Sequence, residues 1–264
     1  MDAGICHLTL IPLRAEPSHR SEMVSQLIFG EPYVVLEACK EWIRVKTCFD
    51  HYEGWIQVEQ YYEITEGDLN AYLESPRLRL RTKVVEAADL GMNLLSMGAM
   101  MGEDSRLPVR FEFAPPDMTT WVPVNNPKEH PTYGQRMKRL KEAAFDLLGT
   151  PYLWGGRTPF GIDCSGFTQL LYSLVDITLP RDASQQVLCG STVDFIQEAT
   201  LGDLAFFDNE DGAVVHVGMV VQPGMIIHAS GCVRVDLLDE TGIFNRESQQ
   251  YSHHLKVVKR VVDN

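Results

Sequence analysis

The stretch Gly161-Ile162-Asp163-Cys164-Ser165-Gly166-Phe167 places a cysteine where a helix is expected to begin. Behind the cysteine, apolar residues recur at the i, i+3, i+4, i+7 spacing of a helix with one buried face. These residues are Phe167, Leu170, Leu171, Leu174 and Val175. Ahead of the cysteine lie glycines and a proline that a helix does not tolerate, so we expect the helix to start near Cys164.

This position has a chemical consequence for Cys164. Unpaired backbone N–H groups at a helix N-terminus favour negative charge, so we expect this thiol to ionise more easily than an ordinary one. The thiolate, unlike the thiol, is a nucleophile. An inert cysteine, preceded by Asp163 as a plain N-cap, fits this stretch equally well. The rest of the chain decides between the two interpretations.

Composition excludes several classes of protein. The chain has 264 residues and a formal net charge of -13, so we expect no nucleic-acid partner, because phosphate binding needs a basic face. None of the six cysteines forms a C-x-x-C pair, which argues against a zinc site. We find no basic and apolar leader and no stretch long enough to span a membrane. These features predict a cytoplasmic protein with reduced thiols, although a trimmed signal peptide would leave the same picture of a periplasmic or secreted one.

The N-terminal part reads as short strands and turns. Residues 32–37, 42–46 and 54–58 are rich in β-branched and aromatic side chains, which predicts a small barrel over residues 1–64. The Glu41-Trp42-Ile43-Arg44-Val45 and Gly54-Trp55-Ile56 motifs resemble the bacterial SH3-like domain. An unrelated small barrel is the alternative. Over residues 65–128 we expect a second, degenerate barrel, with strands at 78–85, 109–113 and 120–124.

The rest of the chain, residues 129–264, predicts an α+β domain. Residues 135–148 show a helical pattern that ends at Gly149, and the Cys164 helix follows. Strands are expected at 204–207, 214–221, 225–229 and 255–262. Helices first and antiparallel strands afterwards indicate helices packed on an antiparallel sheet.

Two histidines interrupt apolar strands of this domain. His216 lies in Val214-Val215-His216-Val217-Gly218, and His228 lies in Met225-Ile226-Ile227-His228-Ala229, with a Pro223-Gly224 turn between the strands. A buried imidazole needs a partner, and histidine is the usual base for a cysteine nucleophile. A regular two-residue turn would put the two rings on opposite faces, so a shared site requires an odd-numbered loop or a β-bulge.

At this point six motifs, in order, resemble the NlpC-type cysteine peptidases, which are papain-like enzymes that cut peptides of bacterial murein. The motifs are Pro151-Tyr152-Leu153-Trp154-Gly155-Gly156, Asp163-Cys164-Ser165-Gly166-Phe167, Leu179-Pro180-Arg181-Asp182, Gly202-Asp203-Leu204, His216-Val217-Gly218 and Ile227-His228-Ala229. The resemblance implies a papain-like NlpC catalytic domain preceded by one or two SH3-like barrels.

The resemblance also implies roles for particular residues. Cys164 matches the nucleophile, His216 the general base, His228 the orienting third residue, and Tyr152 a tyrosine beside the thiolate. Residues that match the substrate-binding positions of the family are Asp163, Ser165 and Asp182. A hydroxyl that many relatives carry after the acidic residue is replaced here by Ala183. Glu53 of the first barrel is a further candidate for the amine end of the substrate, and a solvated loop carboxylate is the alternative.

The resulting hypothesis is a γ-D-glutamyl-L-diamino acid endopeptidase that needs no metal or cofactor. Its expected partners are murein-derived peptides with a free N-terminal L-Ala, with no membrane and no obligate protein partner. We expect Asp163, helped by Glu53, to face the substrate's free amine, because a buried carboxylate needs a partner charge. The alternatives are a secreted hydrolase of intact peptidoglycan and a non-catalytic wall-binding protein.

Overall fold

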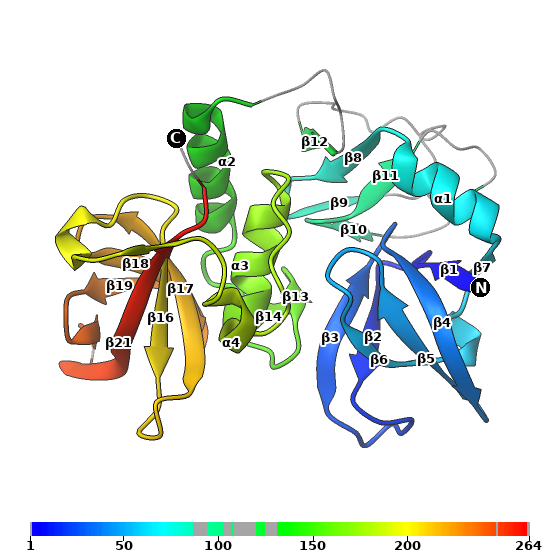
Figure 1. Ribbon diagram of the computed structural model, residues 1–264, viewed down its shortest axis with the longest axis horizontal. Coiled ribbons are helices and arrows are strands. Elements are labelled where there is room, and N and C mark those ends of the chain that lie inside the picture. Colours follow the sequence, from blue (N-terminus) through cyan, green and yellow to red (C-terminus); the bar gives the residue numbers. More distant parts are fainter. Residues whose placement is uncertain are drawn as a thin grey trace. The chain divides into compact units, whose positions relative to one another are not determined.

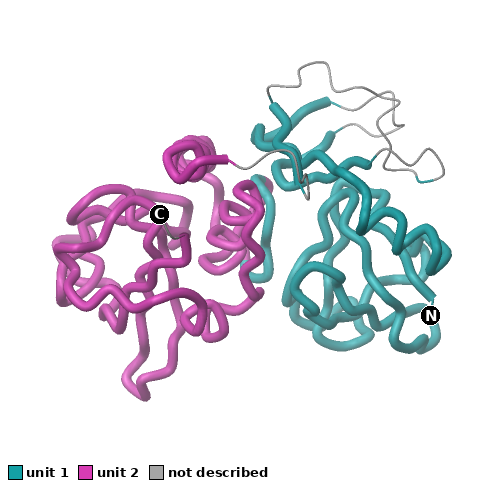
Figure 2. The backbone as a smooth tube through the Cα atoms, turned by 45° about the horizontal axis from the view of Figure 1, so that its top comes forward, with its two compact units in different colours: residues 1–130, 154–159 teal, residues 131–153, 160–264 magenta. Residues whose placement is uncertain are grey.

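A computed structural model of the chain describes residues 2–86, 94–102, 107, 120–124, 131–246 and 248–262. The chain divides into two compact units, coloured separately in Figure 2. Unit 1 comprises Met1–His130 and Trp154–Pro159, and unit 2 comprises Pro131–Leu153 and Phe160–Asn264. The finer division at residues 64 and 128 stays a prediction.

Unit 1 begins with an antiparallel seven-stranded sheet of order β3-β2-β6-β5-β4-β1-β7 (Figure 1). Its strands are β1 (Ala3–Ile5), β2 (Leu10–Arg14), β3 (Met23–Ile28), β4 (Pro32–Cys39), β5 (Trp42–Thr47), β6 (Glu53–Gln57) and β7 (Glu63–Ile64). Buried side chains of these strands form one core, which includes Ile11, Leu13, Tyr33, Val45 and Ile56. The three strands expected around residues 32–58 are therefore confirmed, because their alternating apolar residues fill this core.

The remainder of unit 1 departs from the sequence pattern in two places. A helix, α1 (Glu66–Glu74), follows β7, and Thr65 caps it by accepting a hydrogen bond from the Asp68 amide. The strand expected at 78–85 is divided into β8 (Arg77–Leu80) and β9 (Val84–Glu86). The other strands are β10 (Leu94–Ser96), β11 (Met100–Gly102) and β12 (Trp121–Val124). The last of them confirms the strand expected at 120–124, whereas residues 109–113 lie outside the described residues.

The segment Trp154–Pro159 belongs to unit 1 although it follows the first residues of unit 2 in the chain. Its short strand β13 (Arg157–Thr158) brings Arg157 to the carboxylate of Glu31, with N–O distances of 2.9 and 3.0 Å. Both side chains are only 2% exposed, and the Arg157 amide also donates to the Gln26 side chain. This buried two-point ion pair therefore holds the segment within unit 1.

Unit 2 contains a second seven-stranded sheet, of order β15-β21-β16-β17-β18-β19-β20. The strands are β15 (Ser191–Val193), β16 (Leu204–Asp208), β17 (Val214–Gln222), β18 (Met225–Ser230), β19 (Cys232–Leu238), β20 (Gly242–Asn245) and β21 (Gln250–Arg260). Since β20 also pairs with β21, strands β16 to β21 close into a barrel. The expected strands at 204–207, 214–221 and 225–229 are confirmed, and the last strand begins earlier than expected, at Gln250.

The helices of unit 2 are α2 (Tyr133–Asp146), α3 (Cys164–Ser173) and the short α4 (Ala183–Gln186). Thr132 and Gln135 form a capping box at the start of α2, and Gly149 with φ 77° follows its end. Helix α3 packs against β17, β18, α2 and α4 (Figure 1). The sequence predicted one buried face for α3, but every residue from Cys164 to Tyr172 is buried, because neighbours cover the helix on all sides.

Candidate active site

Cys164 is the first residue of helix α3, as its sequence context predicts. The carboxylate of Asp163, the N-cap residue, accepts a hydrogen bond of 2.7 Å from the Gly166 amide. The strand β14 (Gly161–Ile162) leads into this cap. The glycine-rich segment and the acidic cap together fix the point where the helix begins.

The carboxylate of Asp163 already has a charge partner within the protein. Arg181 donates to both of its oxygens, at 3.1 and 2.5 Å, and to the Ser165 hydroxyl at 2.9 Å. Arg181 and Asp163 are only 2% and 6% exposed, so the pair is buried. Asp163 therefore does not need a substrate ammonium to neutralise its charge, contrary to the reason given for that expectation. A substrate-binding role for Asp163 and Ser165 stays a prediction.

The two histidines share one face of the sheet. The Pro223-Gly224 turn has two residues, but a bulge between Val220 and Gln222 shifts the register by one residue, so that Gly218, rather than Met219, lies opposite His228. His216 therefore lies on the same face as His228, and its Nε2 is 2.8 Å from Nδ1 of His228. A Cβ on Gly218 would come within 2.7 Å of the His228 Cβ, so glycine is needed for this approach. The expectation of a bulge with convergent rings is confirmed.

A carboxylate that the sequence reasoning missed extends this chain. Nε2 of His228 is 3.1 Å from Oδ2 of Asp236, on the neighbouring strand β19. Arg234 donates to the two oxygens of Asp236 at 2.7 and 3.1 Å. Burial raises the pKa of Asp236, but the hydrogen bonds from His228 and Arg234 outweigh it and hold the pKa below its usual range. In the sequence, Arg234 and Asp236 occupy alternate positions of an apolar strand, and this pattern could have indicated an ion pair on one face of the sheet.

His253, on β21, was missed as well. Its ring is stacked on His216, with a centroid distance of 4.1 Å and an interplanar angle of 23°. Burial, reinforced by the neighbouring His228, lowers the pKa of His253 to about 4. His253 is therefore neutral at pH 7 and covers one face of the candidate base.

The surroundings of Cys164 change the expectation about its ionisation. The backbone N–H groups of Val217 and Ser165 point to its sulfur and favour the thiolate. Burial and the nearby Asp163 charge act more strongly and raise the pKa of Cys164 to about 11. Burial and the two other histidines also lower the pKa of His216 well below its usual range. The prediction that the helix terminus makes the Cys164 thiol easy to ionise is therefore wrong for the free protein. The neutral thiol of Cys164 and the neutral imidazole of His216 are favoured instead.

Tyr152 lies near Cys164. Its backbone forms a bridge with Ile162, and its amide donates to the Gly231 carbonyl at 3.0 Å. Burial, followed by the charges of Cys164 and Asp163, raises the pKa of Tyr152 to about 12. Its hydroxyl therefore keeps its proton at neutral pH and can donate a hydrogen bond.

The remaining candidates lie in two places. Asp182 is the N-cap residue of α4, where its carbonyl accepts from the Gln185 and Gln186 amides. Gln186 donates to the Ser165 carbonyl at 3.0 Å and thereby ties α4 to the start of α3. Glu53 belongs to unit 1, where its carboxylate pairs with Arg44 at 2.7 Å and with Lys46 at 3.7 Å. The binding roles of Asp182 and Glu53 stay predictions.

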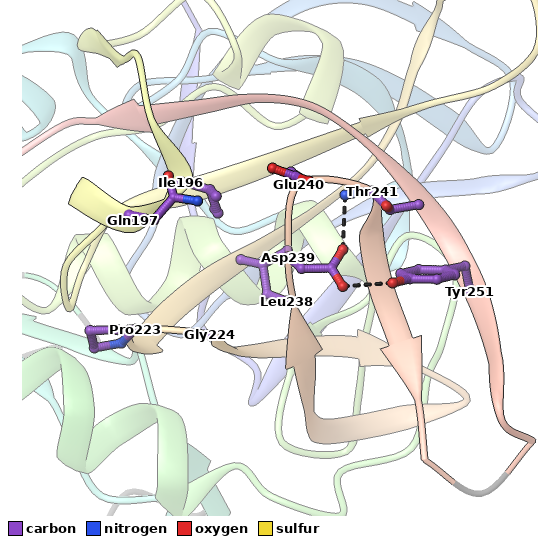
Figure 3. A pocket seen from close by; sticks show the side chains of 9 residues that line it. All are labelled: Ile196, Gln197, Pro223, Gly224, Leu238, Asp239, Glu240, Thr241 and Tyr251. Carbon is purple, nitrogen blue, oxygen red and sulfur yellow. Dashed lines mark hydrogen bonds between the residues drawn. The ribbon is translucent and has the colours of Figure 1, made fainter.

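A surface pocket of unit 2 contains none of these residues. It lies at the turns after β17 and β19 and is lined by Pro223, Gly224, Asp239 and Tyr251, among others (Figure 3). Asp239 accepts hydrogen bonds there from the Tyr251 hydroxyl and the Thr241 amide, both drawn in Figure 3. Within the described residues, no group of three or more His, Cys, Asp or Glu side chains is arranged to hold a metal ion. No helix of the described part combines the length and apolar character needed to cross a membrane.

Together, the helix-start cysteine, the paired histidines and the closed antiparallel sheet define a papain-like cysteine–histidine site. Comparison with known proteins agrees with this class: residues 149–253 match the NlpC/P60 family, and residues 13–60 match the bacterial dipeptidyl-peptidase Sh3 domain. The chain therefore contains an NlpC/P60 domain, preceded by a bacterial SH3 domain.

Curated relatives match most of the length of the chain. A gamma-D-glutamyl-L-lysine dipeptidyl-peptidase of Bacillus cereus is 27% identical, over 80% of this chain and 68% of its own length. Dipeptidyl-peptidase 6 of Lysinibacillus sphaericus is also 27% identical, over 86% and 89%. The crystal structure of an NlpC/P60 family protein from Bacillus cereus covers 100% of both chains with a TM-score of 0.79 at 20% identity, a likeness in fold.

Proposed function

We propose that the protein is a cysteine peptidase that hydrolyses the bond between γ-D-glutamate and the diamino acid of murein peptides with a free N-terminal L-alanine. The proposal rests mainly on the contact between the Cys164 sulfur and the backbone of Val217. Val217 directly follows His216, and the ring of His216 is bonded to His228. The relatives named gamma-D-glutamyl-L-lysine dipeptidyl-peptidase support the class of substrate.

In the proposed reaction, the sulfur of Cys164 attacks the γ-carbonyl of D-glutamate while His216 takes the thiol proton. His216 then gives a proton to the leaving amine, and water hydrolyses the thioester. Because burial favours the neutral thiol and imidazole, proton transfer accompanies the attack on substrate. The Tyr152 hydroxyl, which stays protonated, and the Cys164 amide are the donors assigned to the developing oxyanion.

The amine end of the substrate requires a negative site. Since Arg181 already neutralises Asp163, we assign the main contact with the L-alanine ammonium to Asp182, with Ser165 as a further candidate. In intact wall, that nitrogen is joined to muramic acid and carries no charge. A requirement for the free amine therefore favours released peptides, and we infer a cytoplasmic role in cell-wall peptide recycling.

The bond that is cut can be identified by mass spectrometry of products from L-Ala-γ-D-Glu-L-Lys, the matching diaminopimelate peptide and whole sacculi. We expect L-Ala-D-Glu and the free diamino acid or its peptide as products from the soluble substrates. Cys164→Ala should abolish the products, whereas Cys39→Ala, a change at an exposed cysteine of unit 1, should not. Unchanged turnover by Cys164→Ala would contradict the proposal, and wall binding without any cleavage would indicate a binding protein.

The need for a free amine is tested with the N-acetyl derivative of the same tripeptide. Acetylation removes the ammonium charge and adds bulk at the amine end, which should lower kcat/KM by about tenfold or more. Equal values for the two peptides would indicate a groove that is open at its amine end, and would favour hydrolysis of intact peptidoglycan.

A further inference from the structure

We propose that Asp236, held by Arg234, is a positioning residue that decides which nitrogen of His216 is free to take the proton of Cys164. The inference rests on the proposed function and adds a fourth residue, reached through two histidines, to its reaction. Asp236 acts only through His228, and His228 acts only through His216.

The hydrogen bonds from His216 through His228 to Asp236 form a continuous and buried series. His216, His228 and Asp236 are 5%, 1% and 4% exposed, and the two links between them measure 2.8 and 3.1 Å. In the register of β18 and β19, His228 lies opposite Arg234, so Asp236, two residues further on, points to the same face. The sheet therefore brings the carboxylate to the far nitrogen of His228.

The positions of the protons follow from the carboxylate. An ionised Asp236 can only accept, so Nε2 of His228 must carry a proton and Nδ1 of His228 must be bare. That bare Nδ1 accepts from Nε2 of His216, which must then carry the proton of the neutral imidazole. The remaining nitrogen, Nδ1 of His216, is thus unprotonated and can serve as the base for the thiol.

In the reaction itself, one proton moves within this chain. The S–H bond of Cys164 breaks, its electron pair stays on sulfur, and the proton is bound by Nδ1 of His216. The protons on Nε2 of His216 and Nε2 of His228 remain where they are. The negative charge of Asp236 then stabilises the imidazolium through His228, as a carboxylate does in related triads.

Arg234 keeps Asp236 in the state that this argument needs. The charged and titratable groups around His228 are His216 on β17, Arg234 and Asp236 on β19, and His253 on β21, whose ring centroid is 5.8 Å away. Of these, Arg234 supplies the positive charge beside Asp236, and its guanidinium donates to both carboxylate oxygens. Without Arg234, burial would favour a protonated Asp236. A protonated Asp236 could donate to His228 and so reverse the direction of both hydrogen bonds, leaving the proton on Nδ1 of His216.

The first test is Asp236→Asn, which keeps the shape and removes the charge. We expect kcat on the tripeptide to fall about a hundredfold or more, because the base is lost in part of the molecules, with KM changed less than about twofold. The limb of the kcat/KM–pH profile that reports His216 should move to lower pH. Arg234→Gln should shift both quantities in the same direction by a smaller factor.

Asp239→Asn is the matched control, since this carboxylate lies in the next turn and bonds to Tyr251 rather than to a histidine. It should leave kcat and the pH profile unchanged. If Asp236→Asn also retained wild-type kcat and pH profile, the proposal would be overturned. If Asp236→Asn failed to fold, Arg234→Gln would decide in the same way.

A second measurement does not depend on the peptide substrate. The ¹⁵N shifts of histidine ring nitrogens, recorded in a Cys164→Ala background, report which nitrogen carries the proton. We expect His216 and His228 both to be protonated on Nε2, and Asp236→Asn to populate the other tautomer. Protonation of His228 on Nδ1 in the presence of Asp236 would overturn the proposal even if the peptide is cleaved. If the expected tautomers were observed but the wild-type protein did not cleave the peptide, only the proposed function would be contradicted.

Discussion

Asp163 and Asp236 are both buried carboxylates of unit 2 that pair with an arginine, yet the two arginines lie in different surroundings. Arg181, the partner of Asp163, is 2% exposed, whereas Arg234, the partner of Asp236, is 26% exposed. The first pair joins the start of helix α3 to the chain before α4, and the second ends the chain of histidines. The first pair anchors the start of the helix that carries Cys164, and the second contacts the histidine that is bonded to His216.

The burial of the arginine determines how much each ion pair is expected to contribute to stability. Removing one member of a fully buried pair leaves an uncompensated charge and destabilises the fold. Where the arginine reaches solvent, water already screens part of the attraction within the pair, so losing the arginine changes stability less. We therefore expect substitutions at Asp163 and Arg181 to act mainly on folding, and those at Asp236 and Arg234 mainly on activity.

The largest effect on stability is expected for Arg181→Met. This change leaves the Asp163 carboxylate buried without a cation, which should lower the free energy of unfolding by about 3–5 kcal/mol. Urea denaturation with circular dichroism measures the change. The double variant Asp163→Asn/Arg181→Met should recover part of the loss, because no charge is then left unpaired. A loss below about 1 kcal/mol in the single variant would remove the proposed difference between the pairs.

Gly218→Ala should affect the histidine side of the site. The added Cβ would come within 2.7 Å of the His228 Cβ, and overpacking of this kind costs about 1–3 kcal/mol. We also expect peptide cleavage to fall, because the strands that align His216 and His228 must move apart. Thermal unfolding and kcat measure the two effects. Full activity in the alanine variant would show that the close approach of β17 and β18 is unnecessary.

As the pH is lowered, the stability contributed by His253 and His216 should be lost before the stability contributed by Asp236. The pKa of His253 is about 4 in the folded protein and 6.5 in a model peptide, so the unfolded chain binds more protons between these values. Stability is therefore complete above about pH 6.5 and falls as the pH is lowered towards 4. His216 contributes in the same direction. The contribution of Asp236, whose pKa is lowered, is lost only below the ordinary carboxyl range, near pH 4.

Urea midpoints between pH 7.5 and 4.5 test this order. His253→Phe, which keeps an aromatic ring against His216, should reduce the slope of stability against pH in this interval. An unchanged slope in this variant would mean that His253 does not titrate between these values.

The smallest effect is expected for Glu53→Gln, which extends the comparison to an exposed pair. Arg44 and Glu53 are 42% and 37% exposed, so solvent screens their attraction and the unfolding midpoint should not change measurably. A higher KM for the free tripeptide, with the N-acetyl tripeptide unaffected, would support a contact between Glu53 and the substrate amine. A lower unfolding midpoint would show that this surface pair is structural.

Local sequence signals predicted much of the fold. The cluster of glycines before Cys164 and the acidic cap set the start of α3, and runs of apolar residues marked β16, β17 and β18. The parity of the residues between His216 and His228 even required the bulge that the structure contains. These predictions succeeded because helix caps and strand alternation depend on neighbours in the chain.

Other features escaped prediction because they depend on distant packing. The helix α1 and the strands β19 and β20 have weak patterns, and the role of Asp236 depends on the register of β18 with β19. His253 reaches His216 only because β20 and β21 close the barrel. A single sequence does not specify such registers.

Cys164 shows where the two levels of information separate. The sequence by itself determined the nucleophile candidate, the helix on which it lies and the two histidines, because these follow from motifs and local periodicity. Only the tertiary structure decided that Arg181 neutralises Asp163, that Asp236 ends the histidine chain and that burial raises the pKa of Cys164. The physical reason is that ionisation depends on desolvation and on charges brought together by packing, whereas a helix terminus contributes only a local term.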